Sequence, residues 1–386
     1  MGNAPFTSCR VVILPHQPSR NILVIVGLPD FPGGSEHDKT DIRGPMVTAQ
    51  DVAELAGVSR ATVSYVMNGS DLISDATKRH VMRAVEKLGY HPNGPARALA
   101  GGRTGFIGVA VRIDANTSSV ELSPHLTTII SETERRGNNV LLIPGQEGLP
   151  GIRRIEKQSM VDGLLVYDIE LHEDRLAGLA KLNLPCVLVG TTQDATALPS
   201  VDVDYARIGE LQVDELLRVG CEEILFLDSK AEDADHFNFS RAFTIEGPAY
   251  ARSKGVRASA RFLEGRHWKG IAEVAQDIDT WHGRKVGIAV RTPAILDLLV
   301  ATVRAHGLVP GRDLPIVAVC PNAFAQQHPV SITNIDPLAE QCSTVAVNKL
   351  YALLDGKASG PVRDVIEPEL QRRESTAHPY TATLRA

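Results

Sequence analysis

Residues 47–69 read VTAQDVAELAGVSRATVSYVMNG, and this stretch decides the fold of the N-terminal part of the chain. Thr48 is suited to cap a helix that begins at Ala49. Gly57 can supply the positive φ of a tight turn, and Ser59 is suited to cap a second helix after that turn. Two short helices joined in this way have the dimensions of a helix-turn-helix.

The second predicted helix carries residue types that fit a recognition helix in the major groove of DNA. Arg60, Ala61 and Tyr65 lie near its start, where such a helix meets base edges, so we expect them to read bases. Contacts to the DNA backbone are expected from nearby side chains that can donate to phosphates: Thr48, Ser59, Thr62, Ser64 and Asn68. The alternative is a generic three-helix module that contacts other proteins.

A third helix is predicted over residues 75–88, with Ser74 as its cap and Gly89 as its stop. Its apolar residues recur at helical spacing and therefore share one face: Val81, Ala84, Val85 and Leu88. A linker follows at 93–103, in which residues 96–100 could form a short helix. Helices so short are marginal alone, so we expect this one to fold on DNA.

The pattern changes from Thr104 onward. Short apolar runs alternate with longer amphipathic stretches, which indicates βαβ units and parallel sheets. Strands are expected at residues 106–111, 140–143, 163–167, 186–189, 224–227, 286–290 and 316–319. This part of the chain is long for one doubly wound sheet, so we expect two. The predicted fold is a small all-α helix-turn-helix domain followed by an α/β core of two doubly wound subdomains.

The stretch quoted above resembles the LacI/GalR family of transcriptional regulators. The resemblance continues through Leu88-Gly89-Tyr90, Pro92-Asn93 and Ala96-Arg97-Ala98-Leu99. So many matches in fixed order make a specific motif. The resemblance implies a sequence-specific DNA-binding regulator of transcription, a repressor, that acts as a homodimer on double-stranded operator DNA of palindromic sequence.

The resemblance also assigns a role to the linker. In the family the matching segment folds into a hinge helix on operator DNA, and two such helices lie side by side in the minor groove. We therefore expect minor-groove contacts from Asn93, Ala96 and Arg97. Leu99 stands where a leucine of the family wedges between base pairs and kinks the duplex. The alternative for Leu99 is an ordinary apolar linker residue.

The rest of the chain, to near residue 376, resembles the family's periplasmic-binding-protein-like core less strongly. This implies two subdomains joined by three crossovers, with dimerisation in the core. Four sites depart from the family: Arg291-Thr292 replace Asn-Asp, Cys320-Pro321 replace Asp-Asp, Thr244 replaces an arginine, and an aromatic motif after the first strand is absent from residues 114–124. Because those family residues bind sugar hydroxyls or a purine, the usual effectors are in doubt. Arg291 and Asn322 are the candidate effector contacts, and a solvated strand end is the alternative for Arg291.

The net charge of −6 conceals a division between a basic and an acidic part. Residues 46–103 hold seven basic and five acidic side chains, a net of +2. Residues 1–45, interpreted as a disordered tail or an over-extended start, hold four of each. The remaining 29 basic and 37 acidic side chains give residues 104–386 a net of −8. We therefore expect DNA attraction from the domain at 46–92 and the hinge at 93–103.

The sequence contains no motif that is typical of a catalytic site, a metal site or a cofactor site. It has no H-x-x-x-H pair, no G-x-S-x-G and no P-loop, and the acidic run at 232–236 is interpreted as a solvated loop. Five cysteines without C-x-x-C spacing favour a reducing cytoplasm, and no early apolar run is long enough for a membrane span. Two hypotheses stay open beside a regulator under small-molecule control: a sensor with secondary DNA binding, and an effector-independent regulator with a degenerate pocket.

Overall fold

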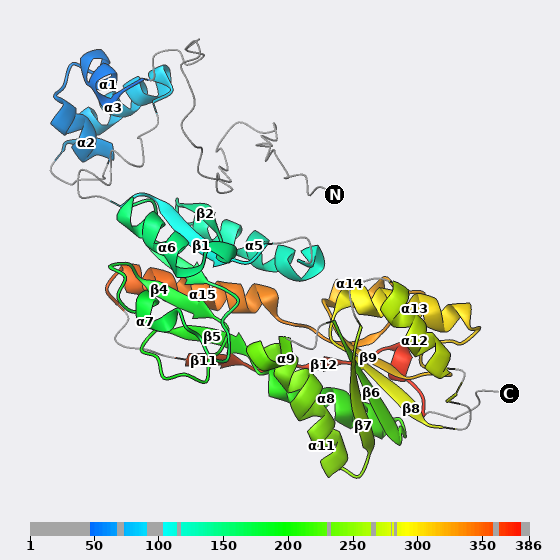
Figure 1. The fold of residues 1–386 in the computed structure, drawn as a ribbon. Coiled ribbons are helices and arrows are strands. Elements are labelled where there is room, and N and C mark those ends of the chain that lie inside the picture. Colours follow the sequence, from blue (N-terminus) through cyan, green and yellow to red (C-terminus); the bar gives the residue numbers. More distant parts are fainter. Residues whose placement is uncertain are drawn as a thin grey trace, which may run out of the picture.

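The structure is a computed structural model that describes residues 47–67, 73–90, 103–113, 117–229, 233–263, 268–278, 280–281, 284–357 and 363–379. Three helices form a unit of their own ahead of the core (Figure 1): α1 (Ala49–Leu55), α2 (Arg60–Met67) and α3 (Asp75–Leu88). All three predicted helices are confirmed, and we call them the three-helix unit.

Helix caps and one shared apolar face hold the three-helix unit together. The Thr48 hydroxyl accepts a hydrogen bond from the Asp51 backbone N–H at 3.4 Å, and the Asp51 carboxylate accepts one from the Thr48 N–H at 2.6 Å. This reciprocal capping lowers the pKa of Asp51. Gly89 ends α3 in the left-handed region at φ +60°, as its role as a stop predicts. Small and β-branched side chains from all three helices meet in one buried cluster: Val52, Ala53, Ala56, Val63, Val66, Val81 and Ala84.

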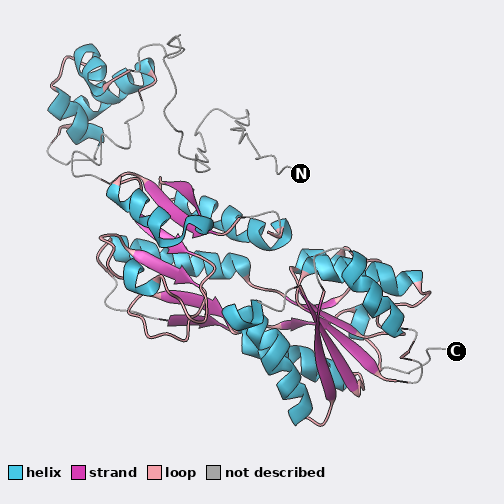
Figure 2. Cartoon of the chain, viewed as in Figure 1, coloured by secondary structure: helices cyan, strands magenta, loops and turns pink. Residues whose placement is uncertain are grey.

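The core begins with a six-stranded sheet in the order β11-β5-β4-β3-β1-β2, in which every pairing is parallel (Figure 2). Its strands are β1 (Phe106–Val111), β2 (Asn139–Pro144), β3 (Gly163–Val166), β4 (Cys186–Val189), β5 (Ser200–Val203) and β11 (Arg363–Ile366). Its helices are α5 (Ser119–Glu134), α6 (Gly148–Lys157), α7 (Leu176–Leu179) and α15 (Ala339–Leu354). We call this part the first lobe.

A second six-stranded sheet has the order β12-β10-β9-β8-β6-β7 and is parallel except for the pairing of β10 with β12. Its strands are β6 (Glu223–Asp228), β7 (Arg257–Phe262), β8 (Val286–Val290), β9 (Ile316–Val319), β10 (Thr333–Ile335) and β12 (Leu370–Gln371). Its α-helices are α8 (Tyr205–Arg218), α9 (Asp233–His236), α10 (Asn238–Arg241), α11 (Gly247–Ser253), α12 (Trp268–Ile278), α13 (Pro293–Ala305) and α14 (Asn322–Gln326). We call this part the second lobe.

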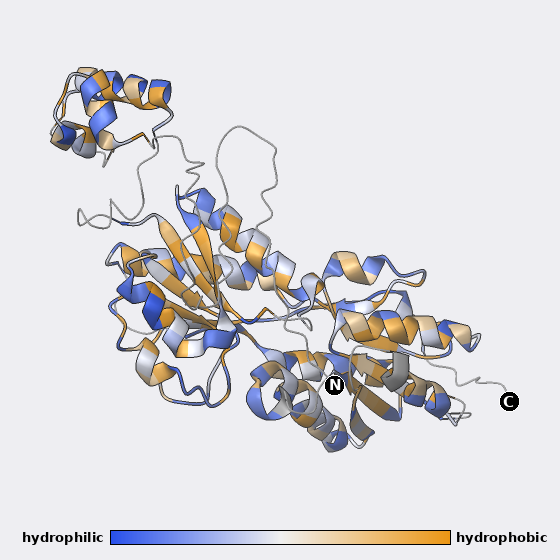
Figure 3. Cartoon of the chain, turned by 45° about the horizontal axis from the view of Figure 1, so that its top comes forward, coloured by the Kyte–Doolittle hydropathy of each residue, from blue (hydrophilic) through white to orange (hydrophobic). Residues whose placement is uncertain are grey.

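Helices cover both faces of each sheet, so the strands are buried on both sides, as parallel sheets require. In the first lobe, Ile129 of α5 and Leu350 of α15 belong to the apolar cluster of one face, and Ile152 of α6 belongs to that of the other. In the second lobe, Leu299 of α13 and Leu216 of α8 belong to the clusters of opposite faces. The hydrophobic residues accordingly follow the strands in Figure 3.

The chain passes between the two lobes three times, from β5 to α8, from β10 to α15 and from β11 to β12. The two subdomains and the three crossovers predicted from the sequence are thus confirmed. All seven predicted strands are present, and the structure adds β5, β7, β10, β11 and β12. These additional strands are short, or, like β7, only partly buried, so their apolar signal is weak.

The described part of the chain contains no helix that combines the length and the apolar character needed to cross a bilayer. Four cysteines fall within it and are buried free thiols: Cys186, Cys221, Cys320 and Cys342. Within the same ranges, no group of three or more His, Cys, Asp or Glu side chains is arranged to hold a metal ion.

Candidate functional site

The turn between α1 and α2 has the geometry that the sequence predicts. Gly57 adopts φ +58°, the left-handed region that favours glycine. The N–H of Val58 donates to the Ala53 carbonyl at 3.0 Å, which closes the end of α1. Ala53 and Val63 are 3% and 1% exposed, so their small side chains allow the two helices to cross closely. The turn therefore fixes the angle at which α2 crosses α1 within the three-helix unit.

One face of α2 is turned away from the apolar cluster and carries the predicted base-reading residues. Arg60 and Ala61 are exposed, and Tyr65 is 51% exposed. In contrast, Val63 and Val66 face inward. Burial of this valine pair holds the helix, while the opposite face remains accessible to a partner.

The hydroxyl residues predicted to contact the DNA backbone also serve as caps. The Ser59 hydroxyl accepts a hydrogen bond from the Thr62 N–H at 3.0 Å and lies 2.9 Å from the Thr62 hydroxyl. Thr48, Ser59 and Ser64 are exposed, and Thr62 is half-buried. Thr48, Ser59 and Ser64 are therefore accessible to a partner, and Thr62 is partly accessible.

Five predicted site residues lie outside the described residues. They are Asn68 at the end of the recognition stretch and the hinge residues Asn93, Ala96, Arg97 and Leu99. Their roles stay predictions.

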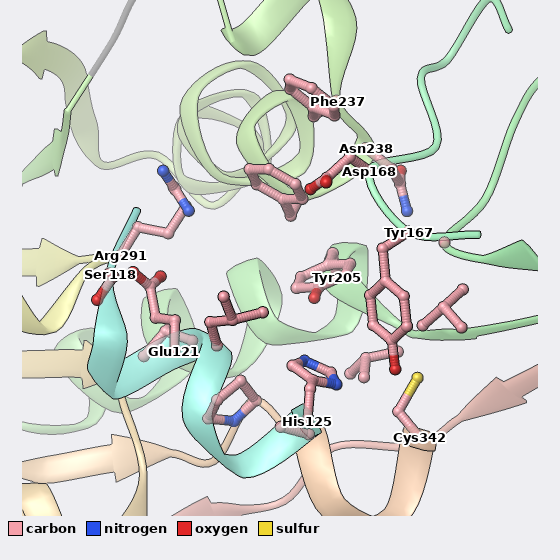
Figure 4. A pocket seen from close by; sticks show the side chains of 18 of the residues that line it. Ser118, Glu121, His125, Tyr167, Asp168, Tyr205, Phe237, Asn238, Arg291 and Cys342 are labelled. Atoms are coloured by element: carbon pink, nitrogen blue, oxygen red, sulfur yellow. The ribbon is translucent and has the colours of Figure 1, made fainter. Parts of the chain in front are cut away.

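A cavity of about 380 Å³ lies between the two lobes. Its wall includes the last residues of β1, β4, β5 and β9, together with Ser229 directly after β6 and Arg291 directly after β8. In open α/β sheets, ligands bind beyond the carboxyl ends of the strands. The cavity thus has the position of a small-molecule site. Figure 4 shows part of its lining, with Tyr205 between side chains from several elements.

Arg291 lines the cavity, but its guanidinium is already paired. Nη2 lies 2.6 Å from Oδ1 of Asp228, and Nε donates to Oδ2 of Asp228 at 2.7 Å. Asp228 is completely buried and also accepts hydrogen bonds from the Ser229 N–H at 2.6 Å and the Ser240 hydroxyl at 3.0 Å. The guanidinium carbon lies 4.9 Å from the centre of the Phe239 ring. Arg291 is therefore part of a buried ion pair, not a solvated strand end.

Asn322, the other candidate effector contact, is exposed and is not among the residues that line the cavity. Its side-chain oxygen accepts hydrogen bonds from Asn334 Nδ2 at 3.0 Å and from Arg373 Nη2 at 3.1 Å. Asn334 Nδ2 also donates to the carbonyl of Cys320 at 2.8 Å. Asn322 thus helps to fix the loop after β9, of which Cys320 and Pro321 do line the cavity.

A neutral hydrogen-bonded group forms one side of the cavity. His125 Nδ1 lies 2.8 Å from the Ser343 hydroxyl, which lies 3.0 Å from the Tyr167 hydroxyl. Burial lowers the pKa of His125 to about 4 and raises the pKa of Tyr167. Both rings are therefore neutral at pH 7, and they meet edge to face with centroids 5.3 Å apart (Figure 4).

Side chains from the two lobes meet directly at the cavity. Asp202 on β5 is 6% exposed, and its Oδ2 accepts a hydrogen bond from Asn238 Nδ2 of the second lobe at 3.3 Å. Its Oδ1 accepts one from the Val203 N–H at 2.9 Å. Nearby, the Leu171 N–H of the first lobe donates to the His236 carbonyl of the second at 2.7 Å. The two lobes are thus linked across the cavity by groups of the chain itself.

Sequence reasoning missed most of the residues that line this cavity. His125, Tyr167, Asp202, Tyr205 and Asn238 had no assigned role, although all five are in the wall. Their positions at or just beyond strand ends could have served as a signal for some of them, but the pairing between distant segments could not be read from one sequence. Thr244, at a position that departs from the family, is buried away from the cavity, and its hydroxyl donates to the Ser240 carbonyl at 2.7 Å.

Comparison with known proteins gives matches to both parts of the chain. Residues 48–93 match the bacterial regulatory proteins of the lacI family, and residues 213–376 match a periplasmic binding protein-like domain. The chain is 31% identical over 351 residues to the HTH-type transcriptional regulator pepR1 of Lactobacillus delbrueckii subsp. lactis, which covers 86% of this chain and 98% of that relative.

Two solved structures share the fold. The Lac repressor dimer bound to operator and the anti-inducer ONPF aligns with a TM-score of 0.71 at 22% identity, over 86% of this chain and 99% of that one. The complex of the transcriptional regulator CelR with cellobiose aligns with a TM-score of 0.58, also at 22% identity, over 85% of this chain and 99% of that one.

Proposed function

This chain belongs to the lacI family of bacterial regulatory proteins, and from that premise we propose that it is a dimeric, sequence-specific repressor of transcription under small-molecule control. The observation that carries the proposal is the exposed face of α2, on which Arg60, Ala61 and Tyr65 stand over a helix held by buried valines. The relative pepR1 is named a transcriptional regulator, not an enzyme, which supports a regulatory function without catalysis.

In this proposal α2 enters the major groove. Arg60 donates two guanidinium N–H groups, one to guanine N7 and one to O6, a contact that is worth about 1–3 kcal/mol of base discrimination. Tyr65 and Ala61 contact neighbouring base edges. Thr48, Ser59, Thr62, Ser64 and Asn68 donate to phosphates and fix the register of the helix on the duplex.

We propose that two copies of the chain bind one operator of palindromic sequence. A single short helix reads few base pairs, whereas a two-fold dimer places two such helices in successive major grooves. The Lac repressor, which shares the fold, was solved as a dimer bound to its operator. Since residues 46–103 carry a net charge of only +2, affinity must depend strongly on this pairing as well as on phosphate attraction.

The linker completes the proposed interface. We assign residues 46–92 to DNA reading, 93–103 to a hinge and 104–386 to dimerisation and effector binding. Asn93, Ala96 and Arg97 contact the minor groove in this scheme, and Leu99 wedges between base pairs, which bends the operator. Because its target is chromosomal DNA, we place this activity in the cytoplasm.

The cavity between the lobes supports control by a small molecule. Its volume of about 380 Å³ is within the usual range for ligand pockets. A ligand bound there would contact both lobes and would change their relative position only if it favoured one arrangement over the other. The CelR structure, which holds cellobiose, supports an effector in this core, and we propose one for this chain.

Selection of bound duplexes from random DNA with the full chain tests the proposed function. We expect enrichment of two inverted half-sites with a fixed spacing, because a two-fold dimer requires inverted symmetry. Enrichment of one half-site without a partner would contradict the dimer. Recovery of unselected sequence would contradict sequence-specific DNA binding itself.

A further inference from the structure

We propose that the effector of the cavity between the lobes is a small hydroxylated amine, such as an amino sugar, whose ammonium group binds at Asp202. The inference rests on the proposed function, in which this cavity is the effector site, and adds the chemical class of the ligand. It follows from which charged and polar groups of the wall are already paired and which are not.

The positive groups of the wall are engaged within the protein. Arg112 forms an ion pair with Glu170, and its guanidinium carbon lies 5.6 Å from the centre of the Phe237 ring. Arg291 is held by both oxygens of Asp228. His125 is neutral because burial lowers its pKa to about 4. An effector with a phosphate or carboxylate would have to break one of these contacts to gain a counter-charge.

The carboxylates of the wall outnumber the guanidiniums. Glu121, Asp168 and Asp202 line the cavity, against Arg112 and Arg291, so three acidic groups face two basic ones, and both basic groups already have a carboxylate partner behind the wall. In Figure 4, Glu121 and Asp168 lie on different sides of the space around Tyr205. A site with this excess of negative charge and with apolar walls attracts a cation and repels an anion.

Among the carboxylates of the wall, Asp202 combines burial with the lack of an ion pair. It is 6% exposed and forms no ion pair with any Lys, Arg or His of the described chain. The Val203 N–H and the Asn238 amide are its hydrogen-bond donors. Burial raises the pKa of Asp202, and its hydrogen bonds and the more distant charge of Arg363 offset only part of that rise. An ammonium group at this position would stabilise the ionised form by a charge-assisted hydrogen bond.

The same wall also contains a buried hydroxyl group whose hydrogen bonding is incomplete. The Thr191 hydroxyl is buried and has no hydrogen-bond partner within the described residues. The hydroxyl lies beside Asp202 and lowers the pKa of that carboxyl in part, as a hydroxyl that points its proton at the carboxylate does, so what its oxygen lacks is a donor. A buried hydroxyl without a partner costs free energy that a ligand hydroxyl would recover. An ammonium for Asp202 and a hydroxyl for Thr191 together describe a hydroxylated amine.

Aromatic side chains complete the match. Phe237 and Phe239 stack with centroids 5.2 Å apart, and Tyr205 meets Phe239 edge to face at 5.9 Å. All three rings line the cavity. Such rings bind the C–H face of a sugar ring, and their π-faces also attract an ammonium group.

Matched ligands that differ at one group test the inference on the full chain. We would compare glucosamine with glucose and glucose 6-phosphate, and do the same with the galactose and mannose sets. Thermal shift and calorimetry should rank the ammonium compound first in at least one set, on the order of tenfold tighter than its neutral parent. Asp202→Asn should abolish that difference, while Asp194→Asn, at a half-exposed aspartate outside the cavity, should preserve it.

The outcomes separate this inference from the proposed function. Equal or tighter binding of the neutral or phosphorylated compounds, or no binding in any set, would overturn the amine assignment. If Asp202→Asn does not fold, Glu121→Gln on α5 provides the same comparison and should reduce the ammonium preference severalfold. DNA selection with the unmodified chain is carried out in parallel. If the chain still selects a specific DNA sequence but shows no preference for the ammonium compounds, the result overturns the ligand class and leaves the proposed function standing.

Discussion

The three-helix unit and the cavity between the lobes hold their functional side chains in opposite ways. In the three-helix unit, Arg60 and Tyr65 are exposed and stand on a short continuous stretch of sequence. In the cavity, the Arg291 side chain is only 12% exposed and is paired with the buried Asp228, a residue 63 positions away. A surface that receives a large polyanion can leave its groups in water, whereas a cavity inside the fold must pair most of its charges in advance.

This difference predicts where each kind of substitution acts. Removing a charge from the cavity should lower the free energy of unfolding of the core, because its partner remains buried. Removing a side chain from the exposed face of α2 should weaken DNA binding and leave stability almost unchanged.

The largest effect is expected from the buried ion pair. Asp228→Ala leaves the Arg291 guanidinium, whose side chain is 12% exposed, without its carboxylate and should lower the free energy of unfolding by about 3 kcal/mol. Asp194→Ala removes a half-exposed carboxylate that pairs with His172 and accepts the Glu173 N–H at 2.7 Å, and should cost about 1 kcal/mol. Urea unfolding measures both. A loss below about 1 kcal/mol for Asp228→Ala would contradict the claim that the charges around the cavity depend on their pairing.

His125 should make the core less stable in acid. Its pKa of about 4 in the folded chain lies below the ordinary value of 6.5, so the folded state binds fewer protons than the unfolded state between these values. The stability that His125 contributes is therefore complete above pH 6.5 and is lost as the pH falls towards 4, by about 3 kcal/mol.

Urea midpoints measured across this pH range test the prediction for His125. The variant His125→Gln keeps a hydrogen-bonding side chain but does not titrate, so its stability should fall less between pH 6.5 and pH 4. An equal loss in the variant and the parent chain would show that other groups cause the acid sensitivity.

A smaller effect, confined to binding, is expected at the exposed tyrosine of α2. Tyr65→Ala should weaken binding to the selected operator by about 1–3 kcal/mol, the range for base contacts. Met82→Ala is the matched control, because Met82 is similarly exposed, at 48% against 51%, but lies on α3. Fluorescence anisotropy gives both affinities. Equal losses would mean that exposure on this unit, not position on α2, governs binding.

The smallest effect is expected at a helix cap. The Ser74 hydroxyl accepts a hydrogen bond from the Thr77 N–H at 3.3 Å at the start of α3. Ser74→Ala should cost about 1 kcal/mol, seen as faster hydrogen exchange along α3 in the full chain. Thr244→Ala, in the second lobe, serves as a control that should leave exchange in α3 unchanged. Unaltered exchange in the Ser74 variant would show that this cap contributes nothing.

The sequence predicted the three-helix unit almost completely, because its determinants are local. Thr48, Ser59 and Ser74 cap the helices that they precede, and Gly57 forms the turn, each within a few residues of its partner. The long apolar strands of the core were predicted for the same reason. β1, β4, β8 and β9 carry enough apolar residues in a row to be recognised alone.

The cavity could not be predicted because its determinants are distant in sequence. The alternative interpretation of Arg291 as a solvated strand end was wrong, since only the fold shows that β6 and β8 are neighbours and bring Asp228 beside it. Strands such as β11 and β12 are fixed by their pairing partners more than by their own residues. Asp202 carries no local sign that β5 will bury it.

The central claim is that α2 reads bases, and position-specific DNA affinity tests it most directly. The selected operator would be varied one base pair at a time, and the affinity of the chain compared with that of Arg60→Ala. The account predicts that the variant loses its preference at one symmetric pair of positions and retains it elsewhere, with a loss of about 1–3 kcal/mol per site. A uniform loss at all positions, or no change at any, would contradict the claim.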